Sequence, residues 1–205
     1  MQIDPTTVPP REIYFRMISM IVPRPIAWVS TVSAEGGANL APFSFFTGVT
    51  SLPPTLVICV GNKRGGVPKD TAANILATGE FVVNLVPYPF TEAMVQTSGS
   101  YSADVDEFEV AGLSTVPSVR VTPPRVQGVP ISIECRLHQC VPIESEPGRV
   151  TSRMFIGRIE LIHLDDSVLD SSGAIDPARL DLVSRLGGQG YARIGARFEV
   201  PRPTV

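Results

Sequence analysis

Three short segments of this 205-residue chain carry side chains whose types and spacing favour ligand chemistry. They read Arg24-Pro-Ile-Ala-Trp-Val-Ser-Thr31, Asn39-Leu-Ala-Pro-Phe-Ser-Phe-Phe46 and Lys69-Asp-Thr-Ala-Ala-Asn74. Their cations and hydroxyls are groups that bind phosphate, and an apolar backbone flanked by aromatic side chains suits a flat ring. The pattern therefore predicts a site for an aromatic phosphate ester.

The third segment predicts a helix start. Asp70 is expected to cap a helix over 71–78 that ends at Gly79, which places Lys69 and Thr71 beside the free amide groups of the first turn. Backbone amides, a cation and a hydroxyl at the positive end of a helix form a competent anion site. The alternative is an ordinary exposed helix start, which is far commoner than a phosphate site.

The first segment adds further donors. Arg24 lies a short, Pro-fixed turn before the strand that carries Ser30 and Thr31. Hydroxyls on strands are also commonly solvent-facing β-formers, so for Ser30 and Thr31 taken singly both interpretations stay open.

The second segment contains a proline within a predicted strand. Pro42 has no N–H and does not suit a fully paired central strand, so neighbouring amides are expected to face a ligand. These are the amides of Ala41, Phe43, Ser44 and Phe45. The acceptors along one edge of a flavin ring would suit such amides, and donors there stabilise the reduced ring. One or more of the phenylalanines is expected in the core, because alternate strand positions face opposite sides.

The elements that must position these segments are mostly strands. Period-2 and β-branched runs predict strands over 26–33, 39–47, 55–60, 80–86, 129–142, 150–164 and 190–198. Helices are predicted over 12–21, 71–78 and 92–98, with Thr91 as a cap, and from Asp176-Pro177 to Gly187-Gly188. This count indicates a mainly β barrel with short helices, and the uniform composition predicts one domain over 1–205.

Composition narrows the function classes. The net charge is −3, and the 17 Lys and Arg residues are scattered, which argues against nucleic-acid binding. The chain shows neither a signal-peptide pattern nor a long apolar stretch, so a soluble cytoplasmic protein is expected. Charged residues make up only 18% of the chain, so apolar surface should remain for a stable homo-oligomer.

Other titratable residues give weaker signals. On one strand Cys135 faces away from His138 and Cys140, so no metal site is expected. Cys59 is interpreted as a buried thiol and His163 as a surface or hydrogen-bonded strand residue. The acidic run Asp104, Asp106, Glu107 and Glu109 is interpreted as a solvated loop.

The three segments, together with Pro53-Pro54, Thr78-Gly-Glu-Phe-Val-Val-Asn84 and Arg185-Leu-Gly-Gly188, resemble the flavin reductase-like family with the FMN-binding split-barrel fold, particularly its flavoredoxin-like branch. The resemblance extends from about residue 14 to Pro203. It implies a six-stranded Greek-key β-barrel and an FMN-binding homodimer with the flavin at the subunit interface. It also implies electron transfer from NADH or NADPH to flavin and onward.

The resemblance further implies which residues bind the cofactor. Residues lining the flavin would be Trp28, Val29, Ser30, Thr31, Ala41, Pro42, Phe43, Ser44 and Phe45, with Ser30, Lys69 and Thr71 towards the ribityl phosphate. Asn62 and Arg64 would add contacts, and Tyr191 would close the site. Hydride transfer is the cofactor's own chemistry, so no catalytic side chain is expected.

Three functional classes remain open. The first is an NAD(P)H-dependent flavin reductase or related oxidoreductase, which could supply an oxygenase partner. The second is a non-enzymatic FMN electron carrier, and the third is a flavin-binding module with a regulatory or storage role. The chain has no Rossmann-type GxGxxG, so a nicotinamide would bind as a transient guest over the flavin.

Overall fold

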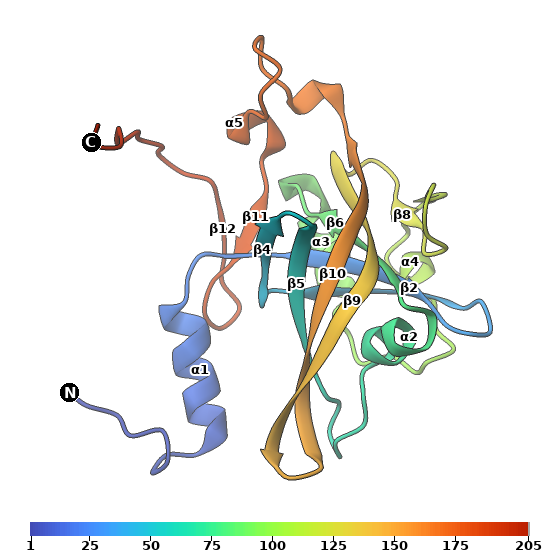
Figure 1. The fold of residues 1–205 in the computed structure, drawn as a ribbon, viewed down its shortest axis with the longest axis vertical. Coiled ribbons are helices and arrows are strands. Elements are labelled where there is room, and N and C mark those ends of the chain that lie inside the picture. Colours follow the sequence, from blue (N-terminus) through green and yellow to red (C-terminus); the bar gives the residue numbers. More distant parts are fainter. Residues whose placement is uncertain (205) are drawn as a thin grey trace.

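The computed structural model describes residues 1–204, and its centre is a seven-stranded antiparallel sheet (Figure 1). The strands follow the order β3-β2-β6-β9-β10-β5-β4 across the sheet. Their bounds are Ala27–Val32 for β2, Ala38–Phe43 for β3, Phe46–Ser51 for β4, Pro54–Gly61 for β5, Glu80–Leu85 for β6, Ile131–Glu146 for β9 and Arg149–Leu164 for β10. The long β9–β10 hairpin therefore joins the two halves of the sheet.

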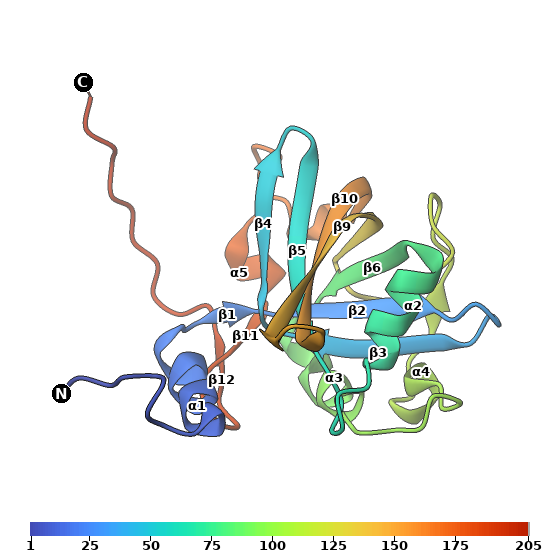
Figure 2. The ribbon, with the colours of Figure 1, turned by 60° about the horizontal axis from the view of Figure 1, so that its bottom comes forward.

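Two smaller sheets and several short helices surround this sheet (Figures 1 and 2). The smaller sheets contain β1 (Arg24–Pro25), β11 (Val183–Arg185) and β12 (Tyr191–Arg193), and β7 (Thr115–Val116) with β8 (Arg125–Val126). The helices are α1 (Pro10–Met20), α2 (Asp70–Thr78), α3 (Thr91–Gln96), α4 (Glu107–Val110) and α5 (Pro177–Leu180), with 3-10 turns at Tyr88–Phe90 and Asp166–Val168. Both views place α1 beside β12, whereas α2 and α4 lie at the far side of the main sheet.

Strand β2 is buried on both faces because its alternate side chains enter two different cores. Ala27 and Val29 belong to a core that also contains Phe81 and Phe155. Trp28 points the other way, into a core covered by residues of α3 and α4. Its indole Nε1–H donates to Thr97 Oγ1 at 2.8 Å, which satisfies the one polar group of a fully buried ring.

The mainly β class is confirmed, but the six-stranded Greek-key barrel is not. The main sheet has seven strands, and within residues 1–204 β3 and β4 form its two edges. The prediction of one strand over 39–47 is wrong, since the chain leaves β3 after Phe43 and enters β4 at Phe46. A single domain over 1–205 stays a prediction, and residue 205 lies outside the described part of the chain.

Several predicted element ends were also wrong. Asp176 does cap α5, by accepting from the Ala178 amide, but the helix ends at Leu180 rather than at Gly187. The next residue, Asp181, has a φ of 43°, a left-handed conformation that ends helices. Residues Val183–Arg185 then pair with β1 as β11.

Two more boundaries differ near the chain's middle and end. The predicted strand over 190–198 shortens to Tyr191–Arg193. Thr91 is the first residue of α3 and not its cap, because its hydroxyl donates to the Tyr88 carbonyl. Among residues 1–204, no helix combines the length and apolar character that crossing a membrane requires.

Candidate functional site

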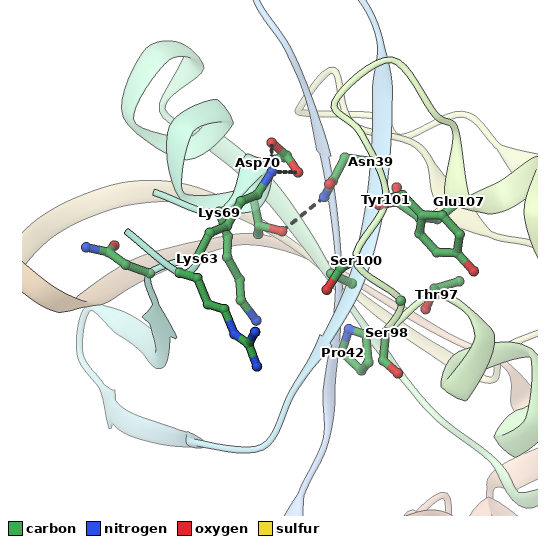
Figure 3. Close-up of a pocket in the computed structure, with 15 residues that line it drawn as sticks. Asn39, Pro42, Lys63, Lys69, Asp70, Thr97, Ser98, Ser100, Tyr101 and Glu107 are labelled. Carbon is green, nitrogen blue, oxygen red and sulfur yellow. Dashed lines mark hydrogen bonds and ion pairs between the residues drawn. The ribbon is translucent and has the colours of Figure 1, made fainter. Parts of the chain in front are cut away.

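A cavity of about 680 Å³ opens between β3, the loop after β5, the start of α2 and the segment after α3. This volume lies within the range of pockets that hold small organic ligands. Figure 3 shows Lys63 and Lys69 on one side of it and Ser98, Ser100 and Tyr101 on the other. The lining residues are Asn39, Ala41, Pro42, Asn62, Lys63, Arg64, Lys69, Asp70, Thr71, Thr97, Ser98, Gly99, Ser100, Tyr101 and Glu107.

One wall of the cavity carries three cations. The Lys63 ammonium contacts both carboxylate oxygens of Asp70, at 2.8 and 2.7 Å. The side chains of Arg64 and Lys69 make no hydrogen bond or ion pair with any other described residue and remain solvent-accessible. The surrounding protein partly desolvates Lys69, and this effect, together with the nearby Lys63, lowers the pKa of the Lys69 ammonium. An anionic ligand would offset the repulsion between the two ammonium groups and stabilise the charged form of Lys69.

The start of α2, with its free backbone amides, forms part of the same wall. Lys69 is the N-cap residue, and no side chain caps the helix. The prediction that Asp70 caps it is therefore wrong, because Lys63 holds that carboxylate instead. Within the described chain, the amides of residues 70–72 donate to no protein acceptor. Uncapped amides beside free cations form an anion site.

Thr71 and Asn39 form the floor next to this helix start. Thr71 is buried, and its Oγ1 accepts from Asn39 Nδ2 at 3.0 Å. The same Asn39 amide donates to Thr31 Oγ1 at 3.2 Å, and Asn74 donates to Thr31 as well. This buried network fixes β3 against α2 and β2.

The register of β3 decides which of its amides face outward. The Leu40 N–H donates to Glu107 Oε2 at 3.0 Å, so Leu40 points its amide away from β2. In an antiparallel pair this direction alternates, which turns the amides of Ala41 and Phe43 toward β2 and leaves Pro42 outward. Pro42 fits this edge position because it has no N–H to satisfy. The predicted ligand contacts from the Ala41 and Phe43 amides thus gain no support from this register.

Glu107 does not belong to a solvated acidic loop, as the sequence suggested. Its side chain lies in the cavity wall with only 6% of the residue exposed. Desolvation raises the pKa of the Glu107 carboxyl and outweighs the hydrogen bonds from the Leu40 amide and from its own amide, and Asp70 and Asp106 act in the same direction as desolvation. Asp106 has a structural role, since its carboxylate accepts from the Phe108 amide and caps α4.

The cavity brings together some of the predicted binding residues. Its lining includes Ala41, Pro42, Asn62, Arg64, Lys69 and Thr71. It does not include Arg24, Trp28, Val29, Ser30, Thr31, Phe43, Ser44, Phe45 or Tyr191. Phe43 lies in the main core with its ring 5.6 Å from the Lys69 ammonium, which confirms the expectation of a core phenylalanine.

Arg24 and Ser30 use their polar groups inside the protein. The buried Arg24 guanidinium donates to the carbonyls of Ile18, Ile21 and Leu186, and its Nε donates to Ser44 Oγ. It thereby ties α1 and the β11–β12 turn to the link between β3 and β4. The Ser30 hydroxyl donates to the Pro124 carbonyl and faces away from the cavity.

Asn62 and Tyr191 also have partners of their own. Asn62 Nδ2 donates to the carbonyls of Gly66 and Val150, at 2.9 and 2.7 Å, while its Oδ1 accepts from Arg153. It therefore shapes the loop that presents Lys63 and Arg64. Tyr191 packs against the second core, and the Arg185 guanidinium lies 4.5 Å from its ring centroid.

The sequence interpretation missed the segment Thr97-Ser-Gly-Ser-Tyr101 after α3. The Tyr101 hydroxyl donates to the Gln96 carbonyl at 3.0 Å, folding the ring over Gly99. A Cβ at Gly99 would lie 2.6 Å from that ring, so a larger residue there would displace the ring. A run of small, hydroxyl-bearing residues directly after a short helix was the available signal. Asn39, Lys63, Asp70 and Glu107 were missed as lining residues as well.

The cysteines and histidines lie elsewhere. Within residues 1–204 no cluster of His, Cys, Asp or Glu side chains is arranged to hold a metal ion. Cys135 is fully buried, whereas Cys59, expected to be buried, is half-buried. The interpretation of His163 as a hydrogen-bonded strand residue is confirmed, because its Nε2 lies 2.6 Å from Glu134 Oε1.

Comparison with known proteins places this architecture. The family model of the flavin reductase like domain matches residues 19–179. Nitrilotriacetate monooxygenase component B from Bacillus cereus superposes with a TM-score of 0.94 at 31% identity, covering 98% of both chains. Pseudomonas fluorescens 2-nitrobenzoate 2-nitroreductase NbaA gives 0.88 at 28% identity, covering 100% of this chain and 97% of its own.

A third solved structure is similar in fold only. Flavoredoxin of Desulfovibrio vulgaris (Miyazaki F) superposes with a TM-score of 0.74 at 22% identity, covering 87% of this chain and 91% of the flavoredoxin. Because the family model spans most of the sequence and the Bacillus cereus relative overlaps it almost completely, this chain belongs to the flavin reductase-like family.

Proposed function

We propose that this protein binds FMN in the cavity and passes electrons from NADH or NADPH through it to an acceptor. The observation that carries the proposal is the pairing of two free cations, Arg64 and Lys69, with the uncapped start of α2. Relatives named as a monooxygenase component and a nitroreductase support an oxidoreductase. Their names do not fix the acceptor or the nicotinamide.

The residues of the cavity fit a flavin phosphate. Lys69, Arg64 and the amides of residues 70–72 would hold the phosphate, which carries up to two negative charges at neutral pH. Lys63 neutralises Asp70, so this carboxylate does not face the phosphate as a free charge. Ala41 and Pro42 provide an apolar stretch of edge strand for the ring. When bound, FMN supplies the ring that accepts hydride, while this chain binds and orients it.

We further infer a homodimer with the flavin near its interface. Apolar side chains remain exposed on α1 and in the turn between β4 and β5, including Met20 at 70% and Leu52 at 88%. Exposed apolar surface of this kind is usually covered by a partner, and an exposed edge strand offers pairing groups to one. Sedimentation velocity at micromolar concentration checks this, and a clean monomer would contradict it.

The reaction is tested by spectroscopy of the purified protein. We expect uptake of FMN to give a yellow protein whose oxidised-flavin absorption bleaches within seconds of anaerobic addition of NADH or NADPH. Free FMN with the same nicotinamide, without protein, is the control. A yellow protein that stays unbleached would instead indicate a carrier or binding role. Failure to take up FMN at all would refute the flavin proposal.

The name of the Bacillus cereus relative also suggests a partner for this chain. Component B of a monooxygenase implies a second component, so an oxygenase is a candidate acceptor for the electrons. Faster nicotinamide oxidation when free FMN is supplied in excess would support a reductase that releases reduced flavin. A rate that does not respond to free FMN would favour a tightly bound cofactor.

A further inference from the structure

The proposed phosphate site leaves one lining residue unexplained, the buried carboxylate of Glu107. A carboxylate is an unsuitable neighbour for a phosphate, and Asp70 in the same wall is neutralised by Lys63. Glu107 has no such counter-ion among the described residues. Its Oε2 accepts from the Leu40 amide at 3.0 Å, and no side chain or amide of another described residue donates to Oε1.

Oε1 keeps access to solvent, and its residue lines the cavity. Within residues 1–204, every side-chain nitrogen or oxygen that is sealed from solvent has a hydrogen-bond partner. Oε1 has no such partner on another residue, so it keeps some solvent access, and Glu107, with 6% exposure, lines the cavity. A carboxylate oxygen that is held in place but left without a donor favours a ligand that brings one.

Asn39 presents the same kind of group in the same cavity. Its Nδ2 donates to Thr31 and Thr71, so its amide carbonyl is left to accept, and Asn39 also lines the cavity. Asn39 is the neighbour in β3 of Leu40, whose amide holds Glu107, and both Asn39 and Glu107 line the cavity. Glu107 therefore adds an acceptor to a cavity in which the cations and the uncapped start of α2 offer donors and positive charge.

We infer that Glu107 binds hydroxyl groups of the ligand and sets the direction in which the ligand lies. The phosphate is held at Lys69, Arg64 and the start of α2, and the polyol chain donates to Glu107 and Asn39. The reversed orientation would bring the phosphate against a buried carboxylate and is disfavoured. The inference rests on the proposed flavin function, because that ligand carries phosphate and hydroxyls on one chain.

Three flavins distinguish the contacts to the phosphate from the contacts to the hydroxyl groups. FMN has the phosphate and the hydroxyls, riboflavin has the hydroxyls without the phosphate, and lumiflavin has neither. We expect Glu107→Gln, which keeps an acceptor for Leu40, to weaken riboflavin binding by about tenfold, as for the loss of a charged hydrogen bond. Lumiflavin affinity should stay unchanged. Affinities are measured by quenching of flavin fluorescence, without turnover.

Glu109→Gln is the matched control, because this acid lies on the same helix but is exposed and outside the cavity lining. Equal weakening of riboflavin and lumiflavin by Glu107→Gln would assign Glu107 a structural role and overturn the inference. The wild-type protein gives a second test that no misfolding can obscure. It should bind riboflavin about tenfold more tightly than lumiflavin, and equal affinities would also overturn the inference.

These outcomes are distinct from failure of the proposed function. If the wild-type protein binds no flavin, the function itself fails and the inference fails with it. If it binds FMN and lumiflavin normally but does not distinguish riboflavin from lumiflavin, the function stands and the role of Glu107 is wrong.

Discussion

Replacing Lys69 by methionine should remove phosphate recognition while leaving the cavity intact. Methionine retains an apolar stem that can contact Phe43, whose ring lies 5.6 Å from the ammonium. The ammonium makes no hydrogen bond with a described residue, so its removal leaves no protein group without a partner. A charge-assisted hydrogen bond contributes about 1.5–3 kcal/mol, so FMN should bind about ten- to hundredfold more weakly. Riboflavin has no phosphate, and its affinity should not change.

The pH dependence of binding gives this prediction a second signature. The pKa of Lys69 is lowered from the ordinary value of 10.5 by desolvation first and by Lys63 second. As pH rises through that lowered pKa, the ammonium loses its charge, and the preference of the wild-type protein for FMN over riboflavin should fall. In Lys69→Met this alkaline decline should be absent.

The same shift fixes the sign of the effect on stability. The folded pKa of Lys69 lies below the unfolded one, so between the two values the unfolded chain binds more protons and stability rises with pH. At neutral pH the charged, partly desolvated lysine destabilises the ligand-free protein. Lys69→Met should therefore not lower the melting temperature of the ligand-free protein.

The assay is flavin fluorescence quenching across the alkaline pH range, with exposed Arg149→Met as the control for a changed net charge. An equal loss of FMN and riboflavin affinity in Lys69→Met would refute the assignment of this lysine to the phosphate. A wild-type preference that does not vary with pH would show that another group holds the phosphate.

Three further predictions concern the frame that positions the site. Gly157→Ala should destabilise the protein by about 1–3 kcal/mol, because its Cβ would lie 2.3 Å from the buried Phe81 ring. Equilibrium urea unfolding measures this, and Phe81→Leu in the same chain should recover part of the loss. Glu134→Gln should cost about 2 kcal/mol, since this fully buried carboxylate accepts from two backbone amides and from His163. Desolvation raises the pKa of Glu134, but these hydrogen bonds outweigh it and leave the pKa below 4.5. The stabilisation should therefore be present above pH 4.5 and be lost as pH falls through the folded pKa. If Glu134→Gln lost stability with falling pH just as the wild type does, this prediction would be contradicted. Arg24→Met should cost roughly 3 kcal/mol by leaving carbonyls without their donor, and limited proteolysis should then cleave near the end of α1, whereas resistance equal to wild type would show that the tie is dispensable.

The start of α2 could be predicted from the sequence because its chemistry is local. A helix N-terminus exposes amides by its own geometry, and Lys69 and Thr71 are fixed beside them by the chain. The mainly β class followed from the period of the strands for the same reason. Arg64, which the family resemblance suggested as a ligand contact, lies in a glycine-rich loop and lines the cavity, and its contact with a ligand stays a prediction.

Tertiary structure decided which polar groups are free to bind. Arg24 and Ser30 have suitable chemistry, but residues 162 and 94 positions away accept their hydrogen bonds, and no local pattern encodes such partners. Glu107 shows the opposite case, since an acidic run that reads as solvated places one carboxylate in the wall by pairing with Leu40, 67 positions earlier. Local sequence sets backbone conformation and charge, whereas burial and partnership depend on which distant segments meet. For this protein the residue types and the helix start could therefore be predicted from the sequence. Only the tertiary structure decided which polar groups are free for a ligand and which bind other parts of the protein.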